Sequence, residues 1–142
     1  MAFRGTFDYS LDAKNRLTVP SSFRPAFADG VVLAREVGPC VSVWTPDGYD
    51  GHVASALDGL HPLSPQGREM RRFLSAYAYP TELDGAGRVM VPPKLIDYAA
   101  LGRDVTVNGA DNHVELWPRG AWDDYDATLS QQFAKLTERF ES

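Results

Sequence analysis

The stretch LDAKNRLTVP, residues 11–20, decides how this sequence is interpreted, because a second version of it, LDGAGRVMVP, occupies residues 83–92. Asp12 and Arg16 in the first stretch correspond to Asp84 and Arg88 in the second. In each copy the residue before the arginine is Asn or Gly, two residue types that adopt a positive φ angle at low cost. We therefore expect each copy to form a tight, hairpin-like turn between two strands.

The repeat extends beyond these ten residues. CVSVW, residues 40–44, and HVELW, residues 113–117, both alternate as strands do and end on tryptophan, and a proline comes within two residues of each tryptophan, Pro46 and Pro118. A shared order of turn, strand and helix start indicates two homologous halves, residues 1–62 and 77–142. Strands are predicted over residues 5–11, 16–20, 31–36 and 40–44, and again over 79–84, 88–92, 104–109 and 112–117.

Short helical segments should follow the repeated stretches, over residues 21–27 and 93–99. Ser21 or Ser22 would cap the first of these helices, and Pro93 suits the first turn of the second. A further helix should occupy the link between the halves, residues 63–76, with Ser64 as N-cap and Pro65 at its first position. Its arginines either face solvent or pair with an acidic neighbour: Arg68, Arg71 and Arg72.

Each half should close with a helix that carries an apolar stripe. In the first half the stripe contains Tyr49, Val53, Leu57 and Leu60. In the second half it contains Trp122, Tyr125, Leu129, Phe133, Leu136 and Phe140. Two interpretations stay open, since such a stripe packs either against its own half or against a neighbouring subunit.

The composition is that of an ordinary globular protein: 142 residues, 44% hydrophobic, 23% charged. The formal net charge is −5, but it is unevenly distributed. Four basic and two acidic residues give residues 1–24 a charge of +2, whereas residues 111–142 carry −4. A locally basic end is compatible with a polyanionic partner, because salt screens distant charges and the partner interacts mainly with the charges close to it.

The sequence also limits the compartment. It contains no apolar run long enough for a membrane span, and its N-terminus lacks the apolar core of a signal peptide. The single cysteine, Cys40, cannot form an internal disulfide and is expected as a buried thiol at a strand start. We therefore expect a cytoplasmic protein with no membrane association.

The sequence gives no indication of an enzyme. His52, His61 and His113 share no metal-ligand spacing, and no nucleotide-binding, zinc-protease or serine-hydrolase motif occurs. Each repeated aspartate has an arginine four residues later, which favours the ionised form and argues against a general acid. We expect no catalytic residue, metal, cofactor or small-molecule substrate.

The repeated turns can instead bind a nucleic acid. The planar guanidinium groups of Arg16 and Arg88 suit phosphate oxygens and the acceptor edge of guanine. A two-stranded element fits the major groove, and two copies would form a pseudo-twofold module. The simpler interpretation is structural: Asp12 and Asp84 accept backbone hydrogen bonds and pair with their arginines inside the turn.

The chain resembles the MraZ family, whose members carry paired SpoVT-AbrB motifs. The resemblance rests on the doubled turn and on MAFRGTF at the start, AGRVMVPP in the middle and HVELW near the end. It implies an α+β fold of two tandem AbrB-type swapped-hairpin, β-barrel-like halves with short helices, related by a pseudo-twofold internal duplication. Residues 1–62 and 77–142 would be the two SpoVT-AbrB repeats, and residues 63–76 the linking helix.

The resemblance also implies a function. Members of this family form closed homo-oligomeric rings and act as bacterial transcriptional regulators associated with the nucleoid. They typically repress the division and cell-wall gene cluster that they head, by binding direct repeats of double-stranded DNA in its promoter. The DNA-contacting motif corresponds here to Asp12 and Arg16, with Lys14 as its basic residue, and to Asp84, Gly87 and Arg88.

One position departs from the family pattern, because Asn15 stands where the motif has glycine.

The hypothesis from the sequence is a repressor in which Arg16 and Arg88 contact DNA, Lys14 and Arg4 neutralise phosphates, and the aspartates orient the arginines. Two alternatives remain: an AbrB-like antitoxin that also binds a toxin, and a ring-forming scaffold whose Asp–Arg pairs are purely internal.

Overall fold

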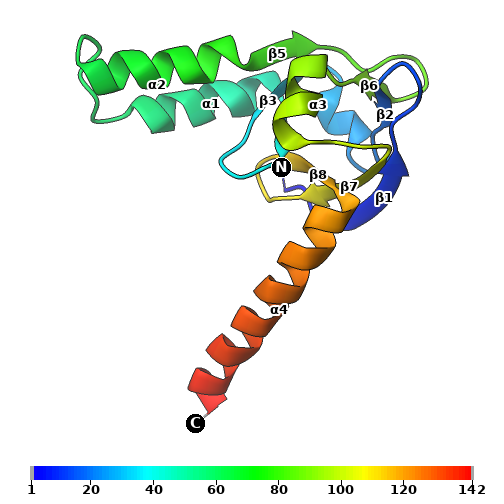
Figure 1. Ribbon diagram of the computed structural model, residues 1–142. Coiled ribbons are helices and arrows are strands. Elements are labelled where there is room, and N and C mark those ends of the chain that lie inside the picture. The colour runs from blue at the N-terminus through cyan, green and yellow to red at the C-terminus, as the bar shows by residue number, and fades with distance from the viewer. Residues whose placement is uncertain (1, 142) are drawn as a thin grey trace.

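The computed structural model describes residues 2–141, without the side chains of Phe140 and Glu141, so Phe140 of the expected stripe lies outside the described side chains. The described chain is an α+β structure, as the sequence predicts (Figure 1). Its elements are β1 (Thr6–Ser10), β2 (Arg16–Thr18), the 3₁₀ helix η1 (Arg24–Phe27), β3 (Val31–Arg35), β4 (Val41–Trp44), α1 (Pro46–Leu57), α2 (Pro65–Ala76), β5 (Ala78–Thr81), β6 (Arg88–Met90), α3 (Pro93–Ala99), β7 (Asp104–Gly109), β8 (Val114–Pro118) and α4 (Arg119–Glu141).

Six of the strands form one antiparallel sheet in the order β1-β7-β8-β4-β3-β5. β1 pairs with β7, so the first strand of the first half lies against the second half. β5 pairs with β3, which is the reciprocal arrangement. By their order in the two halves, β1 to β4 correspond to β5 to β8. When each strand is exchanged for its counterpart, the same strand order results, read in the opposite direction.

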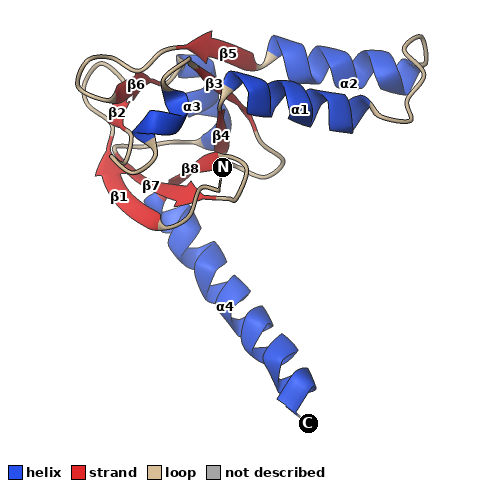
Figure 2. Ribbon diagram, turned by 180° about the vertical axis from the view of Figure 1, so that it is seen from behind, coloured by secondary structure: helices blue, strands red, loops and turns tan. Residues whose placement is uncertain are grey.

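The remaining strands, β2 and β6, form a separate two-stranded antiparallel ribbon (Figure 2). The expectation of a hairpin in each half is therefore wrong in one respect. The turns do lie between strands, but β1 pairs with β7 whereas β2 pairs with β6. Local turn residues could not reveal this, because the pairing partners are supplied by the distant half of the chain.

The main core lies between the sheet, the ribbon and the short helices. From the ribbon, Leu17 and Val89 point into it and are each only 1% exposed. Phe3 packs edge-to-face against Phe23 at a ring distance of 5.3 Å and stacks on Phe27 at 5.4 Å. Burying an aliphatic or aromatic side chain of this size contributes roughly 1.5–3 kcal/mol, so the ribbon is anchored by its inner face.

Helix starts follow the sequence signals in most places. Ser64 caps α2 by accepting a hydrogen bond from the Gly67 N–H at 3.0 Å, and Pro65 is its first residue. Pro93 begins α3 as expected. The expected serine cap of the first short helix is wrong, since η1 begins after Phe23 and has no side-chain cap.

α1 and α2 pack together as an antiparallel pair that extends from one side of the sheet (Figure 1). Tyr49 is buried, and its hydroxyl donates to the Leu74 carbonyl across the pair at 2.6 Å. α1 ends at Leu57, so Leu60 of the expected stripe lies beyond it.

Cys40 is buried directly before β4, as predicted, and burial raises the pKa of its thiol far above the ordinary value.

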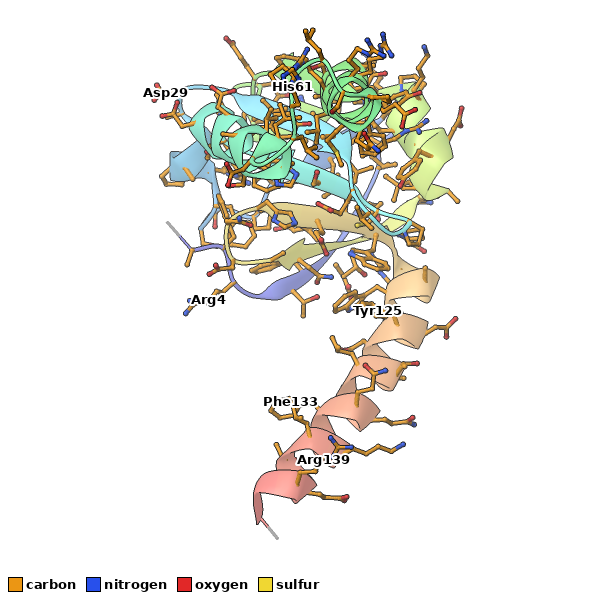
Figure 3. The ribbon with its side chains drawn as sticks, turned by 90° about the vertical axis from the view of Figure 1, so that its left-hand side faces the viewer. Arg4, Asp29, His61, Tyr125, Phe133 and Arg139 are labelled. Atoms are coloured by element: carbon orange, nitrogen blue, oxygen red, sulfur yellow. The ribbon has the colours of Figure 1, made fainter. Side chains whose placement is uncertain are left out.

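α4 extends away from the rest of the chain, and Phe133 projects from it into solvent (Figure 3). Only its base is packed, where Tyr125 stacks on Trp117 at 5.2 Å. Farther along, the apolar side chains are 41–65% exposed: Leu129, Phe133 and Leu136. Packing against its own half is therefore excluded as the role of this part of the stripe. Among the described residues, no helix has the length and apolar character needed to cross a membrane.

Candidate nucleic-acid interface

The first repeated turn is organised by the carboxylate of Asp12. Its Oδ1 accepts the backbone N–H groups of Lys14 and Arg16, both at 2.9 Å. Its Oδ2 accepts the Arg16 side-chain Nε–H at 2.7 Å. Asn15 has a φ of +60°, and its N–H donates to the Asp12 carbonyl at 3.0 Å, which closes the turn.

The second turn makes the same bonds with different residues. Oδ1 of Asp84 accepts the N–H groups of Ala86 and Arg88 at 2.9 Å, and Oδ2 accepts Arg88 Nε–H at 2.8 Å. Gly87 has a φ of +76°, and its N–H donates to the Asp84 carbonyl at 3.0 Å. The aspartate side chain thus braces the backbone and the arginine in both copies.

These bonds determine the protonation state of the two aspartates. The backbone N–H of Arg16, followed by its guanidinium, holds the pKa of Asp12 below the ordinary value. Arg88 lowers the pKa of Asp84 in the same way, again mainly through its backbone N–H. Both carboxylates are therefore ionised at neutral pH and act as acceptors, which suits a brace and not a general acid.

The ribbon places the two arginines on one face. Arg16 pairs opposite Met90, and Arg88 pairs opposite Thr18. Side chains of directly opposed residues, and of residues two apart, point to the same side of a ribbon. Because the alternate pair, Leu17 and Val89, is buried, Arg16 and Arg88 both lie on the outer face.

Strand geometry also gives the spacing of the arginines. Arg16 and Arg88 are diagonal neighbours, and their Cα atoms are about 8 Å apart at ~3.4 Å per strand residue and ~5 Å between strands. That distance corresponds to the rise of two to three base pairs of DNA at ~3.4 Å each. The spacing of the two arginines on the outer face of the ribbon therefore matches neighbouring positions in one DNA groove.

Both guanidinium groups keep donors for a ligand. Within residues 2–141, the hydrogen bonds made by the Arg16 and Arg88 side chains use Nε, and each goes to its own aspartate. The terminal Nη1 and Nη2 groups can therefore donate to phosphate oxygens or to O6 and N7 of guanine. The side chains are 28% and 34% exposed, so both reach solvent.

Two further arginines lie beside the turns, and sequence reasoning did not select either. Arg24 packs against the second turn so closely that a methyl group at Gly87 would collide with it, and its Nε–H donates to the Val19 carbonyl at 2.9 Å. Arg103 lies beside the first turn, lining a pocket with Asp12 and Asn15. Neither arginine belongs to the repeated motif, because the fold brings each of them to its turn from another segment of the chain.

The other predicted basic residues are placed differently. Lys14 is exposed within the first turn, where the second turn has Ala86, so the first turn carries the greater positive charge. Arg4 lies apart from both turns, beside Asp111 at 3.7 Å and at the opposite end of β1 from Asp12 (Figure 3). The structure therefore brings Lys14, Arg16 and Arg88 together but leaves Arg4 at another edge.

Comparison with known proteins identifies the family. Residues 2–58 and 74–141 match the family model described as "MraZ protein, putative antitoxin-like". The chain is 37% identical to a transcriptional regulator MraZ of Salinispora tropica, over 96% of this chain and 95% of the relative. It is 34% identical to that of Natranaerobius thermophilus, over 96% and 94%, and 35% identical to that of Nocardioides sp., over 98% and 96%. The resemblance inferred from the doubled turn is thus confirmed, and the chain belongs to the MraZ family.

Proposed function

We propose that this protein is a DNA-binding transcriptional regulator and not an enzyme. The observation that carries the proposal is the pair of matched Asp–Arg turns, which present Arg16 and Arg88 on one outer face of a single ribbon. The relatives named as transcriptional regulators support the same conclusion.

The β2–β6 ribbon would enter the major groove of double-stranded DNA, which accommodates a two-stranded element. Arg16 and Arg88 would contact base edges or phosphates, and Lys14 would neutralise a phosphate. Asp12 and Asp84 hold both arginines in place before binding, which lowers the entropic cost of ordering them on DNA. Arg4 would reach only a phosphate farther along the duplex.

We further propose that residues 1–62 and 77–142 are tandem SpoVT-AbrB repeats joined by the linker at 63–76, with swapped first strands. The pairings β1–β7 and β5–β3 support this arrangement, as do the matched hydrogen bonds of the two turns. A common origin explains why both halves build the same turn from different residues, Asn15 in one and Gly87 in the other.

The assembly we propose is a homo-oligomeric ring that binds direct repeats in a promoter. The exposed apolar residues of α4 support association with another subunit, because a monomer rarely exposes such a stripe. Linking several weak sites raises avidity by about 10² to 10⁴, so each ribbon alone need not bind tightly. The regulated genes would be the division and cell-wall cluster, with the protein repressing them in the cytoplasm on the nucleoid.

An anisotropy titration with DNA from the region upstream of the protein's own gene tests the DNA site. Arg16→Ala and Arg88→Ala should each weaken binding about tenfold or more, as for loss of a base or phosphate contact. Arg68→Ala, which removes an equal charge from the exposed start of α2, is the control and should bind normally. The affinity should also fall as salt rises.

Light scattering tests the ring. We expect a mass several times that of the 15.7 kDa chain, and Phe133→Ser together with Leu136→Ser should lower it. A monomeric mass for the unmodified protein at micromolar concentration would contradict the assembly. Ring formation without any DNA binding would favour the scaffold alternative, whereas tight copurification of a toxin would favour the antitoxin alternative.

A further inference from the structure

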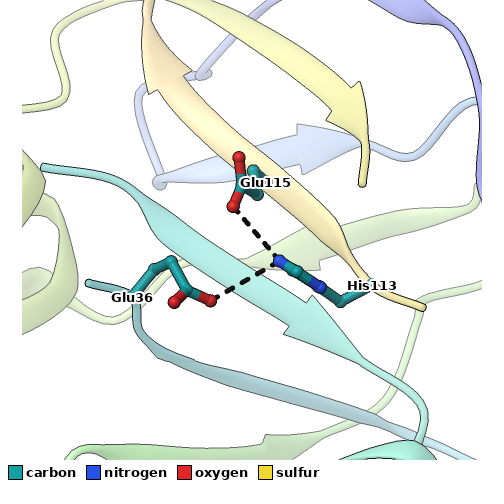
Figure 4. Close-up of side chains that lie close together, drawn as sticks. All are labelled: Glu36, His113 and Glu115. Carbon is teal, nitrogen blue, oxygen red and sulfur yellow. Dashed lines mark hydrogen bonds and ion pairs between the residues drawn. The ribbon is translucent and has the colours of Figure 1, made fainter. Parts of the chain in front are cut away.

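Three side chains outside the ribbon converge on one point, at the junction of the two halves (Figure 4). Glu36 follows β3, His113 precedes β8, and Glu115 lies within β8. His113 Nε2 is 3.1 Å from Glu115 Oε2 and 3.5 Å from Glu36 Oε2. The side chains are 14–20% exposed, so the cluster is shielded but can be reached from solvent.

Each of the three groups is fixed from behind by another bond. The second oxygen of Glu115 accepts the Trp117 indole N–H at 3.1 Å, and that of Glu36 accepts the Val37 backbone N–H at 2.9 Å. Nδ1 of His113 is 2.7 Å from Oδ1 of Asn112. One atom of each group therefore stays directed at the common point, as in metal sites whose outer partners orient the ligands.

The imidazole ring of His113 is also held in its plane. It stacks on Trp44 at a centroid distance of 4.5 Å and an interplanar angle of 13°. Trp44 is 2% exposed and carries His52 stacked at 4.5 Å as well, so it is a rigid support. The orientation of Nε2 is thus determined by buried aromatic packing and not by a mobile loop.

The cluster brings two carboxylates and one imidazole nitrogen together. Among residues 2–141, both Glu36 and Glu115 form their ion pairs with His113, through its Nε2 atom. A divalent cation bound to the same three atoms would balance the two carboxylate charges in this partly buried place.

We propose that Glu36, His113 and Glu115 bind one divalent transition-metal ion of the zinc class. One imidazole nitrogen and two carboxylate oxygens suit such ions, and three protein ligands leave a fourth position for water. At zinc–ligand distances of about 2.1 Å, tetrahedral ligands lie about 3.4 Å apart, close to the separations from His113 Nε2. Small side-chain shifts suffice to complete the site.

Such an ion would add a link between the two halves of the chain, beside those made by the sheet and by the β2–β6 ribbon. Glu36 belongs to the first half, and His113 and Glu115 belong to the second. Glu115 also holds Trp117, on which Tyr125 at the base of α4 stacks. Metal binding should therefore stabilise the junction of the halves and the start of α4.

Titration of the chelator-treated, full-length protein with Co²⁺ and Zn²⁺ tests the proposal. We expect one Co²⁺ per chain, with a visible d–d absorption band that Zn²⁺ abolishes by displacement. Zn²⁺ at 100 times its Kd should raise Tm by about 5 °C or more. Both signals should survive in His61→Gln, which removes an exposed histidine outside the cluster.

Glu36→Gln is the decisive variant, because it keeps the shape of a side chain in the β3–β4 connection and removes one ligand charge. It should weaken Co²⁺ binding by more than tenfold while its metal-free Tm stays close to that of the unmodified protein. Glu115→Gln should weaken binding similarly. Equal Co²⁺ affinity in Glu36→Gln, or no d–d band in the unmodified protein, would overturn the assignment.

Discussion

The two repeated turns have the same hydrogen bonds but different surroundings. Asn15 takes a φ of +60° beside a pocket, whereas Gly87 takes +76° with the Arg24 side chain packed where a Cβ would be. The first turn also carries Lys14 where the second has Ala86. The aspartate and the arginine therefore define this turn, whereas the residue directly before the arginine depends on the space available for a side chain.

The largest effect on stability is expected from Gly87→Ala. The substitution places a β-carbon in the left-handed region and pushes Arg24 off the Val19 carbonyl, so we expect a loss of about 2–3 kcal/mol in the free energy of unfolding. Chemical denaturation measures the loss. Adding Arg24→Ala should relieve the collision but not the backbone strain, and full recovery in that double variant would contradict the explanation.

Asn15→Ala should cost less, about 1 kcal/mol, because only the preference of asparagine for positive φ is lost. Asn15→Gly should be neutral within about 0.5 kcal/mol, since glycine adopts this φ freely but adds entropy to the unfolded chain. The same denaturation experiment compares them. A larger loss for Asn15→Ala than for Gly87→Ala would reverse our view of which turn is the more constrained.

The charge difference between the turns should have a smaller effect, and on DNA affinity alone. Lys14→Ala should weaken binding a few-fold and reduce the salt slope by about 1, as for one lost phosphate contact. Ala86→Lys should do the opposite by giving the second turn the same charge. Anisotropy titrations at several salt concentrations measure both, and an unchanged slope in both variants would mean that these positions do not face phosphate.

The smallest effect concerns pH. Because the pKa of Asp12 and of Asp84 is lowered by folding, their contribution is fully present above the ordinary aspartate pKa of about 3.9 and is lost as pH falls through the lower folded pKa. These two groups should therefore cause no change in stability between pH 5 and 8. Carboxyl NMR titration should give both pKa values below 3.9, and a value at or above it would show that the brace is not formed in solution.

Much of the fold could be predicted because its signals are local. Alternating residues located the strands, and Ser64 with Pro65 located the start of α2. The pairing of β2 with β6 could not be predicted, since it depends on which distant strand completes the core. The same limit applies to Arg24, which lies in η1 of the first half yet contacts Gly87 in the turn of the second half.

The candidate sites divide in the same way. Asp12, Arg16, Asp84 and Arg88 were found because the motif repeats in one sequence. The cluster of Glu36, His113 and Glu115 could not be predicted, because a search for histidine and cysteine spacing does not detect a carboxylate from a distant part of the chain such as Glu36. The apolar stripe of α4 left two interpretations open, and only the position of the helix excluded packing on its own half.

The most direct test of the central claim is DNA binding by the double variant Arg16→Ala/Arg88→Ala. Its matched control is Arg68→Ala/Arg72→Ala, which removes the same charge from exposed positions of α2. We expect the ribbon variant to lose specific binding by at least about a hundredfold, with an unchanged oligomeric mass and a Tm lowered by only a few degrees through loss of the two Asp–Arg pairs, while the control binds as the unmodified protein does. Equal affinity of the ribbon variant and the unmodified protein would contradict the assignment of the ribbon as the DNA-contacting face.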